Sequence, residues 1–129
     1  MSLKNFMILS SISFGMLGLC QTLIPNLTHP LWGISSPNDA VLFMSERWGI
    51  MSLAVGLMTW LSRNQSVMEA KPLLVGCSFL TAMTGGITVF ALSASLIKGP
   101  MAWFAVFFEF TLAIGFTFFL LRKKTIKKT

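Results

Sequence analysis

The sequence predicts an all-α integral membrane protein: a four-helix bundle of up-down topology, with both termini on the cytoplasmic side. The chain of 129 residues is 54% hydrophobic and only 11% charged. A soluble domain of this size cannot bury so much apolar surface, because small domains keep a large surface for their volume. Four apolar stretches each have the roughly 20 residues that cross about 30 Å of hydrocarbon. We therefore treat the whole chain, residues 1–129, as one transmembrane domain.

The four predicted helices cover residues 5–24, 40–61, 72–97 and 101–121. Pro25 ends the first, and Asn38 with Asp39 gives the second a favourable start. We expect the first stretch to be retained rather than cleaved as a leader. Leu19 stands before Cys20 where a small residue is needed, and no small-x-small site follows. Strands are excluded as spanning elements, since the chain shows no alternating polar and apolar segments.

Basic residues give the predicted orientation. The N-terminus, the connection 62–71 and the tail 122–129 carry most of the lysine and arginine, whereas the connection 25–39 has none and the third has only Lys98. Lysine and arginine are enriched in cytoplasmic loops, so the basic end is expected to be cytoplasmic. Tryptophan is enriched at membrane interfaces, which predicts Trp32 and Trp103 at the outer interface and Trp60 at the inner one.

Small residues at three- and four-residue spacing mark the faces where membrane helices approach closely. The first three stretches carry such stripes, with Gly15 and Gly18 in the first, Gly49 and Gly56 in the second, and Thr81 and Thr88 in the third. The fourth stretch instead holds seven of the twelve phenylalanines. We expect the first three helices to pack tightly and the fourth to face lipid, a membrane-protein partner or a second copy through Phe104, Phe107 and Phe108.

Three charged residues fall inside the predicted spans: Glu46, Arg47 and Glu109. Charges in hydrocarbon are costly and raise a functional hypothesis by default. Arg47 lies about 10 Å and Glu109 about 12 Å below the start of their helices, at 1.5 Å per residue. An ion pair between them is therefore geometrically possible. Structural pairing and a proton, ion or ligand site both stay open, and Glu46 and Arg47 could also reach the interface.

Signatures of catalysis and of cofactor binding are scarce. The one histidine, His29, has no clustered carboxylates, so no metal site is predicted. Cys20 and Cys77 lie at different depths and cannot form a disulfide, whose Cα atoms lie within about 7 Å. No nucleophile stands beside a base, and no glycine-rich phosphate loop occurs. The basic residues are not interleaved with stacking aromatics, so nucleic acid is not an expected partner.

The run SERWGI at residues 45–50 opens the second helix, and a third helix, a fourth helix and a basic tail follow. This arrangement resembles the small four-helix membrane proteins of the DoxX-like kind and the Erg28-like scaffold proteins of sterol synthesis. In both, an arginine followed two residues later by a glycine often opens helix two, as Arg47 and Gly49 do here. The resemblance implies a non-catalytic helper that tethers or supports membrane enzymes.

The leading hypothesis is a non-enzymatic accessory, scaffold or assembly subunit of a membrane protein complex, without a cofactor. The alternative is a small oligomeric transporter or proton or ion conductor that uses Glu109 and Arg47. A membrane enzyme acting on a lipid or quinone is a third class, for which the sequence supplies few polar groups. The expected location is the inner or plasma membrane of a bacterium, or the endoplasmic reticulum of a eukaryote.

Overall fold

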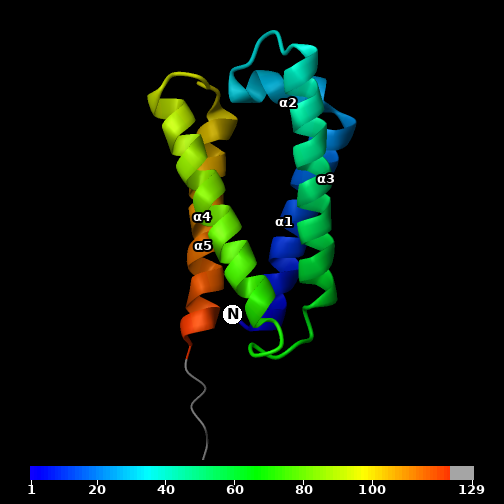
Figure 1. Ribbon diagram of the computed structural model, residues 1–129, viewed down its shortest axis with the longest axis vertical. Coiled ribbons are helices and arrows are strands. Elements are labelled where there is room, and N and C mark those ends of the chain that lie inside the picture. The colour runs from blue at the N-terminus through cyan, green and yellow to red at the C-terminus, as the bar shows by residue number, and fades with distance from the viewer. Residues whose placement is uncertain (123–129) are drawn as a thin grey trace, which may run out of the picture.

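The computed structural model describes residues 1–122 (Figure 1). All regular structure in that range is helical. The elements are α1 (Leu3–Leu23), α2 (Pro25–Thr28), the 3₁₀ helix η1 (His29–Trp32), α3 (Asp39–Leu61), α4 (Lys71–Ser93) and α5 (Pro100–Leu121). Helices α1, α3, α4 and α5 are long and apolar enough to cross a membrane. The all-helical prediction with four candidate spans is confirmed.

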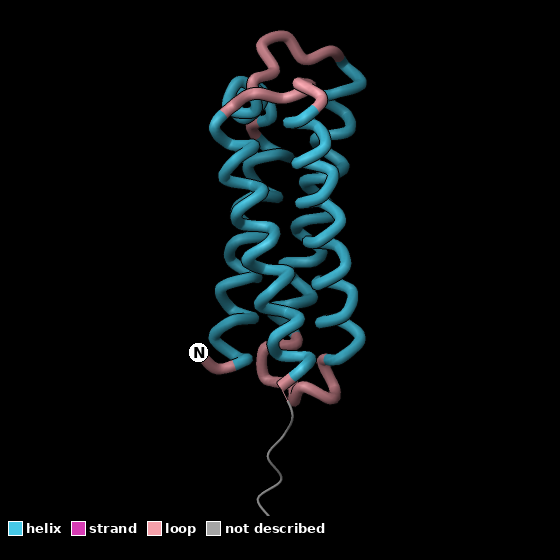
Figure 2. The backbone as a smooth tube through the Cα atoms, turned by 90° about the vertical axis from the view of Figure 1, so that its left-hand side faces the viewer, coloured by secondary structure: helices cyan, strands magenta, loops and turns pink. Residues whose placement is uncertain are grey.

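The long helices run up and down, so the N-terminus, the α3–α4 connection and the end of α5 share one end of the bundle (Figures 1 and 2). We call this the closed end. The opposite end is formed by α2, η1 and the α4–α5 connection. We call α2 and η1 together the roof, and this the roof end. The basic tail begins at Arg122, and its residues 123–129 lie outside the described part of the chain.

Two of the four long helices, α1 and α3, begin at a capping side chain. The Asn38 side chain accepts a hydrogen bond of 3.0 Å from the Val41 amide at the start of α3, and Ser2 caps α1 in the same way. Such caps satisfy amides that have no partner within the helix. Both helices begin within two residues of the predicted positions, because capping is a local property of the sequence.

The predicted end of the third span, residue 97, is wrong. Helix α4 ends at Ser93, and Ser95 has a left-handed backbone with φ of 57°. The Leu96 amide donates to the Ala91 carbonyl at 2.9 Å, and the Ser95 amide donates to the Leu92 carbonyl at 3.1 Å. This pair of bonds is the Schellman motif, which usually has glycine at the left-handed position. Because serine stands at this position instead of glycine, the sequence did not indicate that the helix ends here.

The four long helices form two antiparallel pairs, α1 with α3 and α4 with α5 (Figures 1 and 2). Contacts between the pairs are few, and they join α1 to α5 and α3 to α4. The expectation that the first three long helices form one tightly packed group is therefore wrong. The third long helix packs closely against the fourth instead.

Small residues bring α1 and α3 into backbone contact. A Cβ atom added at Gly18 would lie 2.7 Å from the Gly49 carbonyl oxygen, and one at Gly56 would lie 3.1 Å from the Ser11 carbonyl oxygen. The Ser11 hydroxyl also donates to the Gly56 carbonyl at 2.8 Å. Gly15 presents its backbone amide to Gly56, but its own Cβ position is open. Close approach of this kind holds membrane helices together where lipid removes the hydrophobic driving force.

The pair α4 and α5 uses hydroxyl groups and aromatic rings. The hydroxyls of Ser78 and Thr117 lie 2.7 Å apart and share a hydrogen bond. A Cβ atom added at Gly85 would lie 3.3 Å from the Phe110 ring, so the absence of a side chain there leaves room for the ring. Phe110 of α5 therefore packs against α4. The sequence pattern had instead predicted that the phenylalanines of α5 face lipid or a partner protein.

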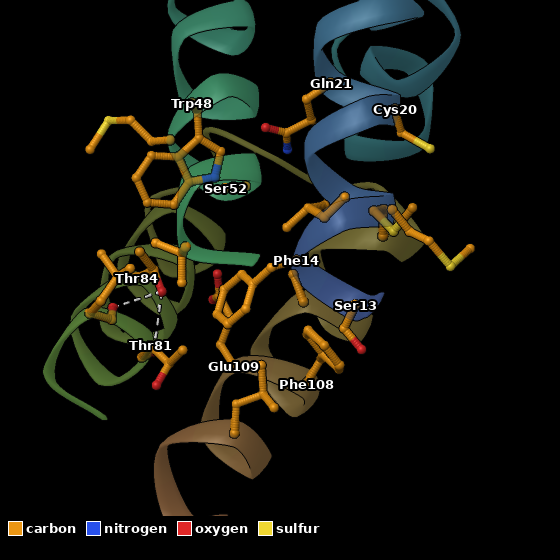
Figure 3. A pocket seen from close by; sticks show the side chains of 18 of the residues that line it. Ser13, Phe14, Cys20, Gln21, Trp48, Ser52, Thr81, Thr84, Phe108 and Glu109 are labelled. Carbon is orange, nitrogen blue, oxygen red and sulfur yellow. Dashed lines mark hydrogen bonds between the residues drawn. The ribbon is translucent and has the colours of Figure 1, made fainter. Parts of the chain in front are cut away.

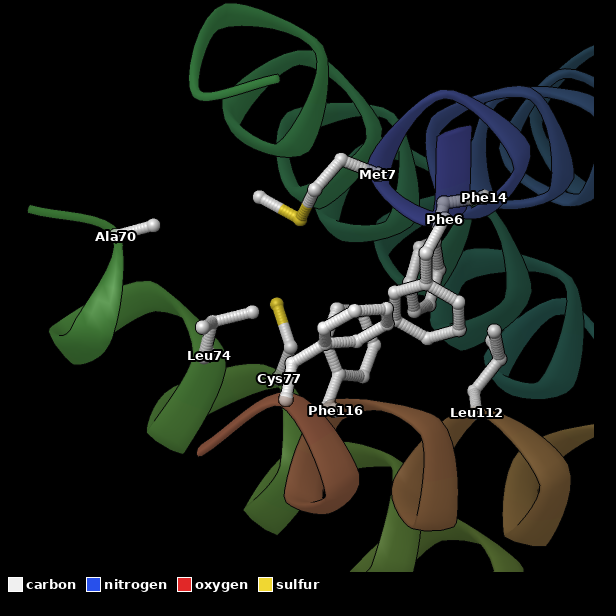
Figure 4. Close-up of a cluster of buried hydrophobic side chains, with 9 residues drawn as sticks. Phe6, Met7, Phe14, Ala70, Leu74, Cys77, Leu112 and Phe116 are labelled. Atoms are coloured by element: carbon white, nitrogen blue, oxygen red, sulfur yellow. The ribbon is translucent and has the colours of Figure 1, made fainter. Parts of the chain in front are cut away.

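Aromatic packing joins the two pairs at the closed end (Figure 4). The rings of Phe6 on α1 and Phe116 on α5 meet edge to face, with centroids 4.9 Å apart, and Phe119 lies 5.3 Å from Phe6. A Cβ atom at Gly115 would lie 2.5 Å from the Phe6 ring. The surrounding core also includes Met7, Phe14, Ala70, Leu74, Cys77 and Leu112. We call Phe6, Gly115, Phe116 and Phe119 the aromatic clasp.

The roof was not predicted as helix, because its prolines and asparagine indicate turns. Each proline instead stands at the start of a short helical turn, where a missing amide does no harm. The Trp32 carbonyl accepts bonds from the amides of Lys98 at 3.3 Å and Gly99 at 3.1 Å. A Cβ atom at Gly99 would overlap the Leu31 carbonyl. The roof therefore rests directly on the α4–α5 connection.

The contact between Gly99 and Leu31 predicts a local effect of Gly99→Ala. We expect the added methyl group to push the roof away and to weaken both bonds to the Trp32 carbonyl. Hydrogen exchange should then speed up at Lys98 and in the roof, with little change in α1. Gly86→Ala is the matched control, because a Cβ atom at Gly86 meets nothing within 4 Å. Equal exchange in the two variants would contradict this contact.

Candidate ligand cavity

A cavity of about 490 Å³ lies between the two helix pairs, above the aromatic clasp and below the roof (Figure 3). Cavities that bind small molecules in proteins have volumes of about 300–1,000 Å³. Its walls are almost wholly apolar and come from all four long helices and the roof. They include Phe14, Leu17, Trp32, Trp48, Met51, Val55, Leu80, Phe104, Phe108 and Leu112.

Within the part of the chain that the structure describes, Glu109 is the only charged side chain that lines this cavity. It is half-buried on α5, and the Thr88 hydroxyl of α4 lies 3.3 Å from its Oε2 atom as a donor. The same hydroxyl also lies 2.9 Å from the Thr84 carbonyl, so its one proton is shared between two acceptors. The carboxyl group therefore keeps most of its accepting capacity for a molecule in the cavity.

The second polar group of the cavity is Gln21, near the roof end of α1. Its side chain is only 7% exposed, and its Oε1 atom has no hydrogen-bond partner. Figure 3 shows it directed toward Trp48 of α3. A buried amide oxygen without a partner costs free energy of desolvation. Sequence reasoning missed this residue, although it is the one glutamine inside a predicted span.

The structure does not form the ion pair between Arg47 and Glu109. Arg47 is exposed and lies over the Phe43 ring at 5.6 Å from its centroid. Helix α3 turns Gly49, Ser52 and Gly56 inward, which places Arg47 away from the cavity. Glu46 is also exposed and does not line the cavity. Of the three charged residues singled out in the sequence, only Glu109 belongs to the site.

The predicted anchors and packing residues fall in different places. Trp32 is half-buried and lines the cavity, whereas Trp103 is 66% exposed. Trp60 stacks with the Arg63 guanidinium at 4.0 Å. Thr81 is buried, lines the cavity and donates to the Cys77 carbonyl at 2.7 Å.

The phenylalanines of α5 that were assigned to a partner surface divide between two faces. Phe104 and Phe108 stack on each other with centroids 5.9 Å apart and line the cavity. Phe107 does not line it and is 74% exposed. Only Phe107 of these three therefore lies fully on the outer surface of the bundle.

No family model, curated protein or solved structure matches the chain. The resemblance to DoxX-like and Erg28-like proteins stays a prediction. Among residues 1–122, no three histidine, cysteine, aspartate or glutamate residues come together as a metal site would need. The cavity is thus the feature from which a function can be argued: an apolar space with a carboxyl group in its wall.

The two cysteines provide a chemical test of the cavity. Both are free thiols, and Cys20 lines the cavity whereas Cys77 is 3% exposed within the core. We expect N-ethylmaleimide to modify Cys20 and to leave Cys77 intact in the folded protein, because only the first thiol borders open space. Peptide mass mapping gives the site of modification. Modification of Cys77 at a comparable rate would contradict the packing at the closed end.

Proposed function

We propose that this chain is an integral membrane protein with four crossings and both termini in the cytoplasm. The four long apolar helices support the insertion. The closed end carries Lys4, Arg63, Lys71 and Arg122, whereas the connections of the roof end carry only Lys98. Lysine and arginine are enriched on the cytoplasmic side. In a bacterium this would be the inner or plasma membrane, and in a eukaryote the endoplasmic reticulum.

Within that membrane, we propose a non-enzymatic accessory role in which the protein holds a lipophilic small molecule between its helix pairs. The cavity of about 490 Å³ is the observation that carries this proposal. Its apolar walls suit a molecule that enters from the hydrocarbon, and a few polar groups suffice to orient such a ligand. The hydroxyls beside Glu109, those of Thr84 and Thr88, also donate to carbonyls of their own helix at 3.0 and 2.9 Å, which favours binding over nucleophilic catalysis.

Filling the cavity tests the binding role. Ala105 lines the cavity on α5, so Ala105→Phe should occupy part of it. Ala82 lies exposed on α4 and does not line it, so Ala82→Phe is the matched control. We expect native mass spectrometry of protein released from lipid nanodiscs to show a small-molecule adduct on the wild type and on Ala82→Phe, but not on Ala105→Phe. An adduct that is absent from all three, or retained by all three, would refute binding in this cavity.

The accessory role also implies a membrane-protein partner or a second copy. The outward face of α5 supports this part of the proposal, because Phe107, Ile114 and Leu121 recur every seven residues and are each at least 69% exposed. Purification in mild detergent should yield a stable complex that Phe107→Ala weakens. A chain that purifies alone and monomeric would count against a partner on this face.

Glu109 also favours a second candidate function, a small transporter or proton or ion conductor. A carboxyl group in the wall of an intramembrane cavity is a common element of such pathways. The role first assigned to Arg47 falls away, because that side chain faces out. Flux measured in liposomes should drop in Glu109→Gln if this candidate is correct, and unchanged flux would dismiss it.

A further inference from the structure

We propose that the ligand of the cavity is a lipophilic organic cation, whose positive charge lies against Glu109. This inference rests on the proposed binding function and adds the chemical class of the ligand. It follows from the sign of the charge in the cavity wall and from the aromatic rings of that wall, and the unpartnered acceptor of Gln21 supports it.

The charge of the cavity wall has one sign. Among the described residues 1–122, no lysine or arginine lines the cavity, and Glu109 is the only acidic residue that does. The same described residues give Glu109 no ion pair, and its side-chain partners across the helix interface are the neutral Thr84 and Thr88. An unpaired carboxylate in an apolar medium is costly. A cationic ligand would supply the missing opposite charge, whereas an anion would add repulsion.

The cavity wall offers a hydrogen-bond acceptor without a partner, beside the N–H donors of Gln21 and Trp48. Gln21 keeps its Oε1 atom without a partner although the side chain is buried. The Thr81 hydroxyl donates to the Cys77 carbonyl of its own helix at 2.7 Å, so its remaining capacity is that of an acceptor. Acceptors of this kind stabilise positive charge or N–H donors on a ligand.

Aromatic rings complete the wall. Phe14, Trp48 and Phe108 line the cavity together with Glu109, and Figure 3 shows the Phe14 ring in front of Glu109 in this view, with Phe108 further to the side. The faces of aromatic rings attract cations, most strongly where water is excluded. Gln21 lies about 10 Å nearer the roof end than Glu109, at 1.5 Å of helix rise per residue. The ligand therefore has room for an apolar body beside its charge.

Three probes of matched shape test this inference: tetraphenylphosphonium, tetraphenylborate and neutral tetraphenylsilane. The readout is the concentration of each probe that protects Cys20 from N-ethylmaleimide, measured on the full chain in an uncharged detergent. We expect tetraphenylphosphonium to protect the wild type at the lowest concentration. Glu109→Gln should raise that concentration by at least about tenfold, equivalent to about 1.4 kcal/mol, and should leave protection by tetraphenylsilane unchanged.

The neutral probe separates the possible failures. If tetraphenylsilane still protects Cys20 in Glu109→Gln, this variant is folded. We expect Gln21→Leu to raise the protecting concentration of tetraphenylphosphonium by a smaller factor and to leave that of tetraphenylsilane unchanged. If tetraphenylborate protects as well as tetraphenylphosphonium, or if Glu109→Gln leaves the cation unaffected, the cation proposal is overturned while binding in the cavity stands. If none of the three probes protects wild-type Cys20, both proposals fail.

Discussion

Gly49→Val is expected to prevent stable pairing of α1 with α3. A Cβ atom at this position would overlap the Thr22 hydroxyl and would lie 2.9 Å from both the Gly18 carbonyl oxygen and the Thr22 amide. Backbone atoms cannot rotate away as a side chain can, so the two helices must separate. Overpacking of a well-packed site costs about 1–3 kcal/mol and sometimes more, and we expect a value at the upper end.

Reversible unfolding by sodium dodecyl sulfate from mixed micelles of lipid and detergent measures this loss. Gly76→Val is the matched control, since Gly76 is exposed on α4 and its Cβ position is open. The control carries the same penalty of a β-branched residue in a helix without the steric overlap. Equal stability of the two variants would show that the glycine contact does not hold α1 to α3.

Phe116→Ala is expected to open the aromatic clasp. Phe116 is 0% exposed and meets Phe6 of the other helix pair. In a membrane the transfer part of the loss is small, because lipid is as apolar as the core. The cavity part remains, and a volume of roughly 100 Å³ at about 24 cal/mol per Å³ gives about 2–3 kcal/mol.

The same unfolding experiment applies, with Phe107→Ala as its control because Phe107 is 74% exposed. The clasp also predicts a pattern that overall stability alone does not show. Loss of Phe116 should make Cys77 reactive toward N-ethylmaleimide, since this thiol packs in the same core. If Phe116→Ala is destabilised but Cys77 stays unreactive, the loss of stability does not come from opening of the core around Cys77.

The fold was predictable as far as it depends on local sequence. A span is decided by about 20 consecutive apolar residues, and caps such as Asn38 are decided by their immediate neighbours. The end of α4 at Ser93 escaped because serine rarely takes the left-handed position at which Ser95 stands. The roof escaped because Pro25 and Pro30 fit a turn as well as the first position of a short helix.

The pairing of helices was not predictable from the stripes. A small-residue stripe says which face another helix approaches, but not which helix approaches it. Thus Gly18, Gly49 and Gly56 identify the α1–α3 contact, whereas the threonines of α4 line the cavity or face α5. On α5, two residues determine the neighbours of the helix. Gly115 leaves room for the Phe6 ring of α1, and Thr117 shares a hydrogen bond with Ser78 of α4.

The candidate site was predictable only in part. Glu109 was identified because an acidic residue in a span is costly. Its partnership with Arg47 failed because the small face of α3 points inward and carries Arg47 outward. The cavity itself depends on how the two helix pairs diverge toward the roof end, which no stretch of sequence encodes alone. Gln21 and Trp48 can be recognised as residues of the site only once the cavity is known.

The pairing of consecutive helices sets an order for biosynthesis. Residues 1–62 contain the complete α1–α3 contact, so this hairpin can close through Gly18 and Gly49 before α4 has been translated. Domains and their parts generally fold in the order in which they are made. Phe6, however, must wait until Phe116 and Phe119 have left the ribosome. The first turns of α1 are therefore the last part of the chain to form their contacts. Truncation within α5 would leave a complete α1–α3 hairpin in which Phe6 has no aromatic partner from α5.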